Sequence, residues 1–408
     1  MEKREVCIIG AGPAGTVAAL FLARAGIRCT LIDKGRFPRH KICGDGISGW
    51  VVSVLKELDP SIIARLVGED FVLPSHGMRV SAPNGKFVDI PFADDSGDQE
   101  KIPPGFVAPR VAFDHFLFSL AAAHPLIEVW EETAISGCVR EEGEIRLIAS
   151  DGEPKAKARM VLFANGHSGK IFPEAHRMKN AHEIIGIRGY FKDVTGFHEK
   201  NHIEIHFLKE ILPGYLWLFP MTGGGANVGL GAARELIKRK KINLKRELEK
   251  ALQMPRFSSR FRSTLTESPL QAGSIPIWKG RAAVSGNNYL LLGDAANLAD
   301  PVTGEGIGHA VVSGKYAALQ VGQALSAGRF DAEFLTAYDE KLYGVIGEEL
   351  RISSKIRKVL KHPFLINTFI DKAQNNPYFR QVLEDALANL DDREKLKKPW
   401  FYVKMLFR

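Results

Sequence analysis

Three glycines followed by a carboxylate are the residues whose spacing most clearly predicts ligand binding by this chain. Gly10, Gly12 and Gly15 form G-x-G-x-x-G, and Asp33 follows about 20 residues later. The first glycine permits a tight turn, the second lets the backbone approach a pyrophosphate, and the third lets a helix pack closely on a strand. A carboxylate at this distance can accept hydrogen bonds from a ribose 2′-OH. The pattern therefore favours a dinucleotide ligand over a purely structural turn.

The segments around these residues predict the strand–helix–strand unit that such a motif requires. The apolar run 6–9 predicts a buried parallel strand, 16–25 a helix, and 28–32 a second strand that ends at Asp33. The N-terminus of the helix then faces the phosphate charge. Residues 6–23 carry no charge, but the glycines and the proline at 10–15 break any membrane-spanning helix. Burial in a doubly wound sheet accounts for the apolar composition.

A second motif late in the chain predicts another contact with the same kind of ligand. Residues 289–292 read as a buried strand, and Asp294 follows it at a position where a carboxylate can bind a ribitol hydroxyl. A loop then leads into a helix predicted over 308–325, whose first N–H groups and positive dipole suit an electron-rich ring edge, such as that of a reduced flavin. The loop contains Pro301, Gly304, Gly306 and Gly308.

The composition is that of a soluble globular protein with excess positive charge. The chain has 408 residues, 45% of them hydrophobic and 25% charged, with a net charge of +8. Its length suits two or three domains. The four cysteines show no metal-binding spacing, so no metal site is predicted, and no signal peptide is recognised, so we expect a cytoplasmic protein. No nucleic-acid recognition motif accompanies the charge, and no nucleic-acid partner is expected.

The segment 395–408 has a distinct composition. It holds five Lys and Arg residues, no acidic residue, and several aromatic side chains. Cations mixed with aromatics suit an anionic membrane surface, which would make the protein peripheral at the inner face of the membrane. Docking of this segment on its own protein explains the composition equally well.

The order of the predicted elements indicates an α/β chain with discontinuous domains. Strands of a parallel sheet occur early (6–9), mid-chain (158–164) and late (289–292), while 185–231 alternates as an antiparallel sheet does. We therefore expect a Rossmann-like nucleotide-binding domain, an antiparallel β-sheet substrate domain and a helical C-terminal region. Their expected bounds are 1–75, 105–180 and 275–335 for the first, 76–104 and 181–274 for the second, and 336–408 for the third.

Both motifs, with Arg110 before a predicted helix, resemble the FAD-dependent flavoproteins of the para-hydroxybenzoate hydroxylase superfamily. The resemblance covers roughly residues 1–330. It implies an extended FAD whose ADP part lies at the first motif, whose ribityl and pyrophosphate lie at Gly293-Asp294, and whose ring lies at the late glycine loop. The implied cofactor-binding residues are Gly10, Gly12, Pro13, Ala14, Gly15, Asp33, Lys34, Cys43, Gly44, Arg110, Asn165, Gly166, Gly293, Asp294, Pro301, Gly304, Gly306 and Ile307.

Two further segments resemble the geranylgeranyl reductase family within that superfamily. One is FPRHKICGDGIS at 37–48, and the other is PGYLWLFP at 213–220, followed by NVGLG. The resemblance places the Cys43 loop beside the flavin and makes the second segment a wall of the substrate cavity. Tyr215, Trp217 and Phe219 alternate along a predicted strand and so share one face. The substrate-binding residues implied are these three, and the implied catalytic residues are Cys43, Tyr215 and Trp217.

The resemblance implies reduction of a prenyl C=C bond, with hydride from N5 of reduced FAD. Cys43 has three interpretations: a thiol activated by nearby cations, a proton relay, or a side chain that packs on the ring. Asn165 stands where related hydroxylases carry an aspartate that helps to place FAD and the pyridine nucleotide. The electron donor therefore stays open between NAD(P)H and a reduced redox protein.

Other functions remain open from the sequence. One is a monooxygenase or halogenase that acts on an aromatic or polyene substrate. Another is a flavin-binding redox sensor without turnover. The expected substrate of the leading interpretation is an apolar small molecule or a lipid.

Overall fold

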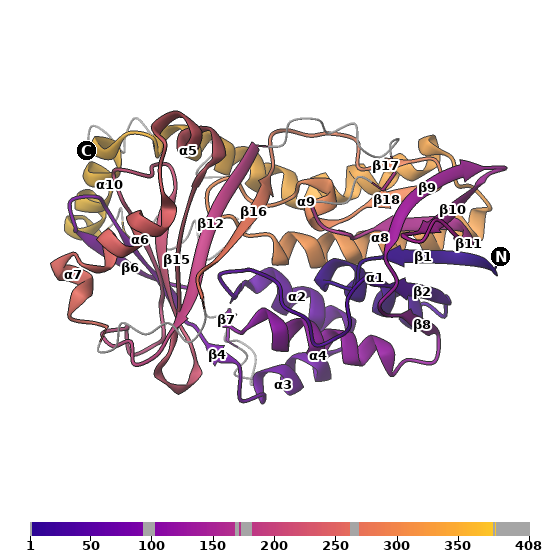
Figure 1. Cartoon of the computed structure of the whole chain (residues 1–408), viewed down its shortest axis with the longest axis horizontal. Helices are drawn as coiled ribbons and strands as arrows, with labels where there is room; N and C mark the ends of the chain where they lie inside the picture. The colour runs from indigo at the N-terminus through magenta and orange to yellow at the C-terminus, as the bar shows by residue number, and fades with distance from the viewer. Residues whose placement is uncertain are drawn as a thin grey trace.

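Two β-sheets dominate the computed structural model, one at each end of the molecule (Figure 1). The structure describes residues 2–92, 103–167, 171–172, 182–261, 269–377 and 380. Within them, eight strands form the first sheet, in the order β17-β18-β11-β1-β2-β8, with β10 and β9 continuing from β11. Its strands are β1 (Glu2–Ile9), β2 (Cys29–Ile32), β8 (Ile127–Trp130), β9 (Ile135–Glu141), β10 (Glu144–Ala149), β11 (Pro154–Phe163), β17 (Ser285–Gly286) and β18 (Tyr289–Leu291).

The central strands of this sheet are parallel, and their carboxyl ends are in register. Ile9 of β1 pairs with Ile32 of β2 and with Phe163 of β11, and Phe163 pairs with Leu291 of β18. The segments that follow these strands therefore meet at one edge of the sheet. In open α/β sheets this edge is where ligands bind.

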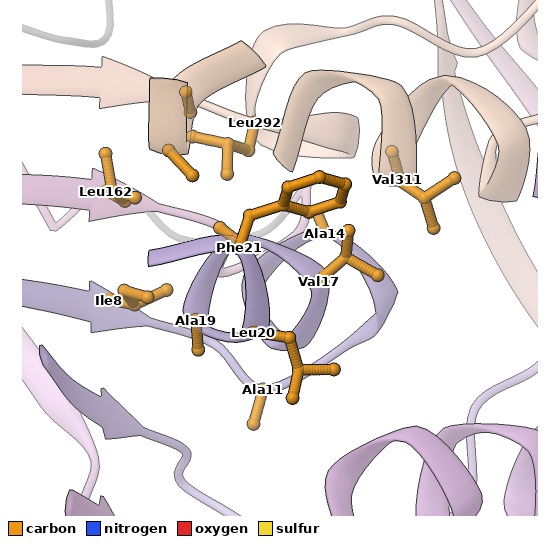
Figure 2. Close-up of a cluster of buried hydrophobic side chains, with 14 of the residues drawn as sticks. Ile8, Ala11, Ala14, Val17, Ala19, Leu20, Phe21, Leu162, Leu292 and Val311 are labelled. Atoms are coloured by element: carbon orange, nitrogen blue, oxygen red, sulfur yellow. The ribbon is translucent and has the colours of Figure 1, made fainter. Parts of the chain in front are cut away.

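The helices that pack on the first sheet cover an almost wholly apolar core. They are α1 (Pro13–Arg24), α2 (Gly49–Leu58), α3 (Pro60–Val67), α4 (Arg110–Ala122), the short 3₁₀ helix η3 (Gly293–Ala296), α8 (Ile307–Ala327) and α9 (Ala332–Val359). Helix α1 is buried along nearly its whole length because it packs between the strands and α8. Figure 2 shows Val17 and Phe21 of α1 beside Val311 of α8, with Ile8 and Leu162 on the strands to the left.

The second sheet is mainly antiparallel, and its strand β14 alternates half-buried and buried residues. Its order in the described part of the chain is β16-β12-β15-β14-β13-β5-β6, with β13 and β5 parallel. The strands are β5 (Gly77–Ser81), β6 (Phe87–Pro91), β12 (His182–Phe191), β13 (Ile203–Phe207), β14 (Tyr215–Pro220), β15 (Ala226–Ala233) and β16 (Gln271–Ile277). The short strands β3 (Gly46–Ile47), β4 (Leu73–Pro74) and β7 (Phe106–Val107) pair separately.

The remaining helices cover the second sheet. They are α5 (Arg234–Lys240), α6 (Leu244–Leu252), α7 (Pro255–Ser258), the 3₁₀ helix η2 (Thr222–Gly224) and α10 (Pro363–Asn375). Helix α10 buries Ile366 and Ile370 against Val88 and Ile90 of β6, so the C-terminal helices close one side of this sheet. Among the described residues, no helix has both the length and the apolar composition needed to cross a membrane. The predicted tail at 395–408 lies outside the described residues.

A buried imidazole in the second sheet predicts loss of stability in acid. Burial lowers the pKa of His206 on β13, although Glu204 lies 2.9 Å from its Nε2 atom and opposes the shift. The unfolded chain, with an ordinary histidine pKa of about 6.5, then binds the proton more readily than the folded chain. The free energy of unfolding therefore falls as the pH drops below that value.

We expect His206→Gln to reduce the drop in unfolding temperature between pH 7.5 and pH 5, measured by circular dichroism. Surface His115→Gln is the matched control, because His115 is exposed on α4. An unchanged drop in the His206 variant would show that this imidazole does not carry the acid sensitivity.

Candidate active site

One continuous cavity of about 1530 Å³ runs from the carboxyl ends of the parallel strands to the face of the second sheet. A pocket of roughly 300–1,000 Å³ suffices for a drug-sized ligand, so this cavity has room for more than one such molecule. Its walls come from the strand ends of the first sheet, from β13 and β14 of the second, and from α9 and α10. Segments far apart in the sequence thus share one site.

The first glycine motif forms the wall at the end of β1. Gly10 has φ of +105° and the N-cap Gly12 has no side-chain cap, so the first N–H groups of α1 face the cavity without a side chain in the way. A Cβ on Gly12 would meet only Arg39, at 3.6 Å, whereas a Cβ on Gly15 would lie 1.9 Å from the carbonyl oxygen of Gly10. Gly12 therefore leaves space for a ligand, and Gly15 serves helix packing.

Asp33 directly follows β2 and connects this motif to the neighbouring loop through hydrogen bonds. Its Oδ2 accepts a hydrogen bond from the backbone N–H of Ala11 at 2.8 Å, and its Oδ1 accepts one from Gly35 at 2.9 Å. Arg39 donates to Oδ2 at 3.2 Å. The carboxylate thus ties the two strand ends to the loop that follows, and it lines the cavity as well.

The second motif lies across the cavity at the end of β18. Asp294 faces Lys41, whose Nζ lies 3.7 Å from Oδ2, so a carboxylate and an ammonium from distant segments lie on facing walls. Helix α8 begins after Gly306 without a side-chain cap, and Gly304, Gly306 and Ile307 line the cavity. This is a second helix start with free N–H groups facing the same space.

The loop before α8 is held in place by Asp300. Its Oδ1 accepts hydrogen bonds from the backbone N–H groups of Val302 and Thr303, both at 2.8 Å. Tyr215 of β14 donates its hydroxyl to the carbonyl of Thr303. The tyrosine therefore connects the second sheet to this loop, and its position at the junction is fixed.

Cys43 lies on a loop between the two sheets, where its surroundings favour the neutral thiol. Burial raises the pKa of Cys43, and this outweighs the nearby Arg110 guanidinium. The carbonyl of Cys43 accepts a hydrogen bond from Nδ2 of Asn227 at 2.9 Å. Of the three interpretations of this cysteine, activation to a thiolate by cations is the one that the environment disfavours.

Asp45 anchors the same loop through a buried network that the sequence analysis missed. It is fully buried at φ of +68°. Its Oδ2 accepts hydrogen bonds of 2.7 Å from the hydroxyl of Tyr190 and from Nδ2 of Asn227. Burial raises the pKa of Asp45 despite these donors. The only local signal for the network was the polar Asp45 directly after Cys43-Gly44.

The aromatic strip on β14 faces the cavity as its alternation predicts. Leu216 and Leu218 are fully buried behind the strand, whereas Tyr215, Trp217 and Phe219 line the cavity. Trp217 donates its indole N–H to Oδ1 of Asn227 at 2.9 Å, which joins it to the Asp45 network.

Phe219 covers the two glycines that flank Asp45. A Cβ on Gly44 would lie 3.3 Å from its ring, and a Cβ on Gly46 would lie 3.2 Å from it. The glycines therefore allow the Cys43 loop to lie close against the aromatic strip.

Beyond the strip the cavity becomes an apolar arm. Its walls come from strands of the second sheet and from the inner faces of α9 and α10. Apolar walls of this kind exclude water and suit a hydrocarbon chain. The lining side chains are Met78, Val80, Ile90, Ile203, Ile205, Phe207, Ile352, Ile356, Leu360, Phe369 and Ile370.

Glu305 and Glu349 are two further carboxyl groups at the cavity that the sequence analysis did not select. Burial raises the pKa of Glu305, and its carboxyl is hydrogen-bonded to the hydroxyl of Ser48. Trp50 donates its indole N–H to Glu349 at 3.2 Å. Glu305 stands between two selected glycines, so its position in that loop was the available signal.

The structure brings together all but two of the residues that the sequence predicted for the site. Gly15 packs against Gly10, and Pro301, whose carbonyl accepts a hydrogen bond from Arg357, lies behind the cavity wall. The others line the cavity: Gly10, Gly12, Pro13, Ala14, Asp33, Lys34, Cys43, Gly44, Arg110, Asn165, Gly166, Tyr215, Trp217, Phe219, Gly293, Asp294, Gly304, Gly306 and Ile307.

Comparison with known proteins finds a matching domain family and several similar reductases. Residues 3–169 match the FAD binding domain family. The chain is 28% identical to a digeranylgeranylglycerophospholipid reductase of Thermoplasma volcanium over 83% of each chain. It is also 28% identical to a menaquinone reductase of Mycolicibacterium smegmatis, over 78% of this chain and 76% of that protein.

A solved structure supports the same fold. A geranylgeranyl bacteriochlorophyll reductase-like protein from Thermoplasma acidophilum superposes with a TM-score of 0.79 at 22% identity, over 97% of this chain and 99% of the other. The predicted α/β architecture, with an antiparallel sheet and C-terminal helices, is thereby confirmed. The chain is an FAD-dependent oxidoreductase that is similar, at low identity, to the geranylgeranyl reductase-like group.

The cavity of this flavoprotein fits FAD on grounds that are independent of the comparisons. Two helix starts without side-chain caps face it, and they suit the pyrophosphate and the electron-rich ring edge. Gly12 leaves open space where a side chain would intrude. Asp33 and Asp294 offer carboxylates for hydroxyl groups at separate positions on the walls. The predicted cofactor, FAD, is confirmed.

Proposed function

We propose that this flavoprotein reduces carbon–carbon double bonds of a prenyl chain carried by a lipid or a quinone. The observation that carries the proposal is the apolar arm, which continues from the Cys43 loop and the Tyr215–Phe219 strip to α10. An unactivated alkene has no polar group to recognise, so shape and water exclusion must hold it. The two relatives named above support this class of substrate.

In this proposal FAD would lie extended along the cavity. Gly10, Gly12, Asp33 and Lys34 hold its ADP part. Arg110 and Asp294 lie along its middle, and the loop 304–307 receives the ring. When bound and reduced, FAD supplies a hydride to one carbon of the double bond.

The chain supplies the proton for the other carbon. In our proposal Cys43 holds that proton on Sγ, because burial keeps the thiol neutral. Transfer to the substrate carbon leaves a thiolate, which regains a proton from water. Trp217, fixed by Asn227, and Phe219 orient the alkene over the cofactor and exclude solvent. Tyr215 keeps the glycine loop in place.

An anaerobic experiment tests the proposed function. The purified protein, reduced with dithionite, receives digeranylgeranylglycerophospholipid or menaquinone in detergent, and flavin absorbance and product mass are followed. We expect flavin reoxidation with a gain of two hydrogens per reduced bond in the prenyl-chain fragments of the product, which separates alkene reduction from reduction of a quinone ring. Flavin that stays reduced until oxygen is admitted, with incorporation of oxygen or halide into a substrate, would replace this proposal with a monooxygenase or halogenase. The same assay with NADPH or a reduced ferredoxin in place of dithionite identifies the electron donor.

Narrowing the apolar arm should lower the activity on substrates with long prenyl chains more than on those with short ones. Val80 is half-buried on the wall of the arm, and Val80→Trp fills part of it. We expect kcat/KM for a digeranylgeranyl lipid to fall by roughly tenfold or more, in line with the cost of misfit in an apolar pocket. Geranyl substrates should keep their rate. Val139→Trp, on the exposed surface of β9, is the matched control. An equal loss for short and long chains would show that Val80 does not line the chain-binding arm.

A further inference from the structure

The corner between α9 and α10 is strongly basic. Residues 351–370 contain five Lys and Arg residues and no Asp or Glu. Lys355, Lys358 and Lys361 are exposed there, on the last turns of α9 and in the short link to α10. A cluster without counter-charges in its own segment attracts anionic surfaces. We call residues 355–364 the basic corner.

Exposed apolar side chains lie within the same corner. Phe364 is 75% exposed at the start of α10, and Val359 is 44% exposed at the end of α9. Phe364 is the most exposed of the large hydrophobic residues in the described part of the chain. Single exposed hydrophobics are ordinary, but a phenyl ring and a valine between lysines combine the two features of an interfacial surface.

The inner side of the same two helices lines the cavity. Ile352 and Ile356 of α9 and its C-cap residue Leu360 follow one another at four-residue spacing. They line the apolar arm together with Phe369 and Ile370 of α10. The exposed lysines of the basic corner and part of the lining of the apolar arm therefore come from one helix pair, at the end of the molecule that bears the second sheet (Figure 1).

We propose that the basic corner docks on an anionic phospholipid membrane. The lysines lie against the lipid phosphates, while Phe364 and Val359 enter the boundary between headgroups and acyl chains. Charge and apolar contact act together, because each alone gives only weak, reversible binding. The inference rests on the proposed function for its purpose, since a prenyl lipid would then pass from the membrane into the arm beside the corner. The docking itself does not depend on catalysis.

Vesicle sedimentation with the full-length holoprotein tests the docking. We expect binding to vesicles of phosphatidylglycerol and phosphatidylcholine in equal parts, and little to phosphatidylcholine alone. The double variant Lys358→Gln/Lys361→Gln should weaken the affinity for these vesicles roughly 30-fold. The reason is that each lysine close to an anionic surface contributes to the free energy of binding. Phe364→Ser should weaken it further in the same background. The control pair Lys3→Gln/Lys155→Gln removes equal charge at the opposite end of the molecule and should leave binding unchanged (Figure 1).

Hydrogen exchange locates the contact without relying on variants. Anionic vesicles should slow exchange of the amides in 355–366. Protection confined to 381–408, or affinity unchanged by the corner variants, would overturn the proposal and assign membrane binding to the tail. Absence of binding by the unmodified protein would overturn it as well. Failure of the proposed function is seen separately, as absence of alkene reduction in detergent, which leaves the vesicle result unaffected.

Discussion

Replacement of Cys43 by alanine should lower turnover of a prenyl substrate by roughly 100-fold or more and leave FAD bound. The size of the loss is that of removing a positioned proton donor. FAD should stay because Cys43 holds its loop through the backbone carbonyl, which accepts from Asn227, and because the carboxylate of Asp45 anchors the next turn. The measurement is single-turnover reoxidation of reduced flavin under anaerobic conditions, with FAD content from the absorbance spectrum.

The pH dependence distinguishes a proton donor from a packing residue. Burial raises the pKa of the Cys43 thiol above its ordinary value, so the protonated form persists to higher pH than in a free cysteine. Activity should therefore hold as the pH rises through about 8.5 and fall only above it. Cys43→Ser replaces the thiol with a hydroxyl of similar size and should retain part of the rate. Cys138→Ala, at a buried cysteine of β9, is the control that removes a thiol elsewhere. Full activity of Cys43→Ala would show that the thiol only packs.

Gly10→Ala should unfold much of the protein or leave it without FAD. Gly10 has φ of +105°, and a Cβ there would lie 2.3 Å from the carbonyl oxygen of Ala164 in the next strand connection. Neither atom can move without displacing the end of β1 or β11, because the two strands are paired up to Ile9 and Phe163. We expect a loss of roughly 3 kcal/mol or more in the free energy of unfolding, from backbone strain and overpacking together.

A second glycine separates the two contributions. Gly26 also has positive φ, of +75°, but a Cβ there would meet nothing within 4 Å. Gly26→Ala should therefore cost only the backbone strain, about 1–2 kcal/mol, and retain FAD. Urea denaturation of both variants, with FAD content measured by absorbance, gives the comparison. Equal losses in the two variants would contradict the steric argument at Gly10.

Local sequence patterns were sufficient to predict a strand or a helix where apolar residues follow the short period of that element. The apolar run at 6–9 became the buried end of β1, and the helix predicted at 16–25 became α1, which begins slightly earlier at Pro13. The segment 234–253 has a helical composition throughout, yet it forms two helices. Lys241 adopts a left-handed conformation that ends α5, and Asn243 caps α6 by accepting from the N–H of Arg246. A hydrophobic period continues through such a break, so periodicity alone does not reveal it.

The domain bounds and the roles of individual site residues stay predictions. The structure describes which of these residues line one cavity, and substitution experiments are what assign their roles. Asp45, Tyr190 and Asn227 illustrate what sequence patterns omit: the pairs are separated by 145 and 182 residues, yet their side chains form 2.7 Å hydrogen bonds. Their polar character is local, but their partners are not.

The sequence by itself determined the FAD-binding unit, because glycine spacing, strand length and a terminal carboxylate are all set within about 30 consecutive residues. It also determined which face Tyr215, Trp217 and Phe219 share, because alternation along a strand is local. Only the tertiary structure decided that α9 and α10 line the apolar arm, that Cys43 is buried enough for its pKa to rise, and that Lys41 faces Asp294. Burial and side-chain pairing depend on contacts between segments hundreds of residues apart, and those contacts exist only after the two sheets have packed together.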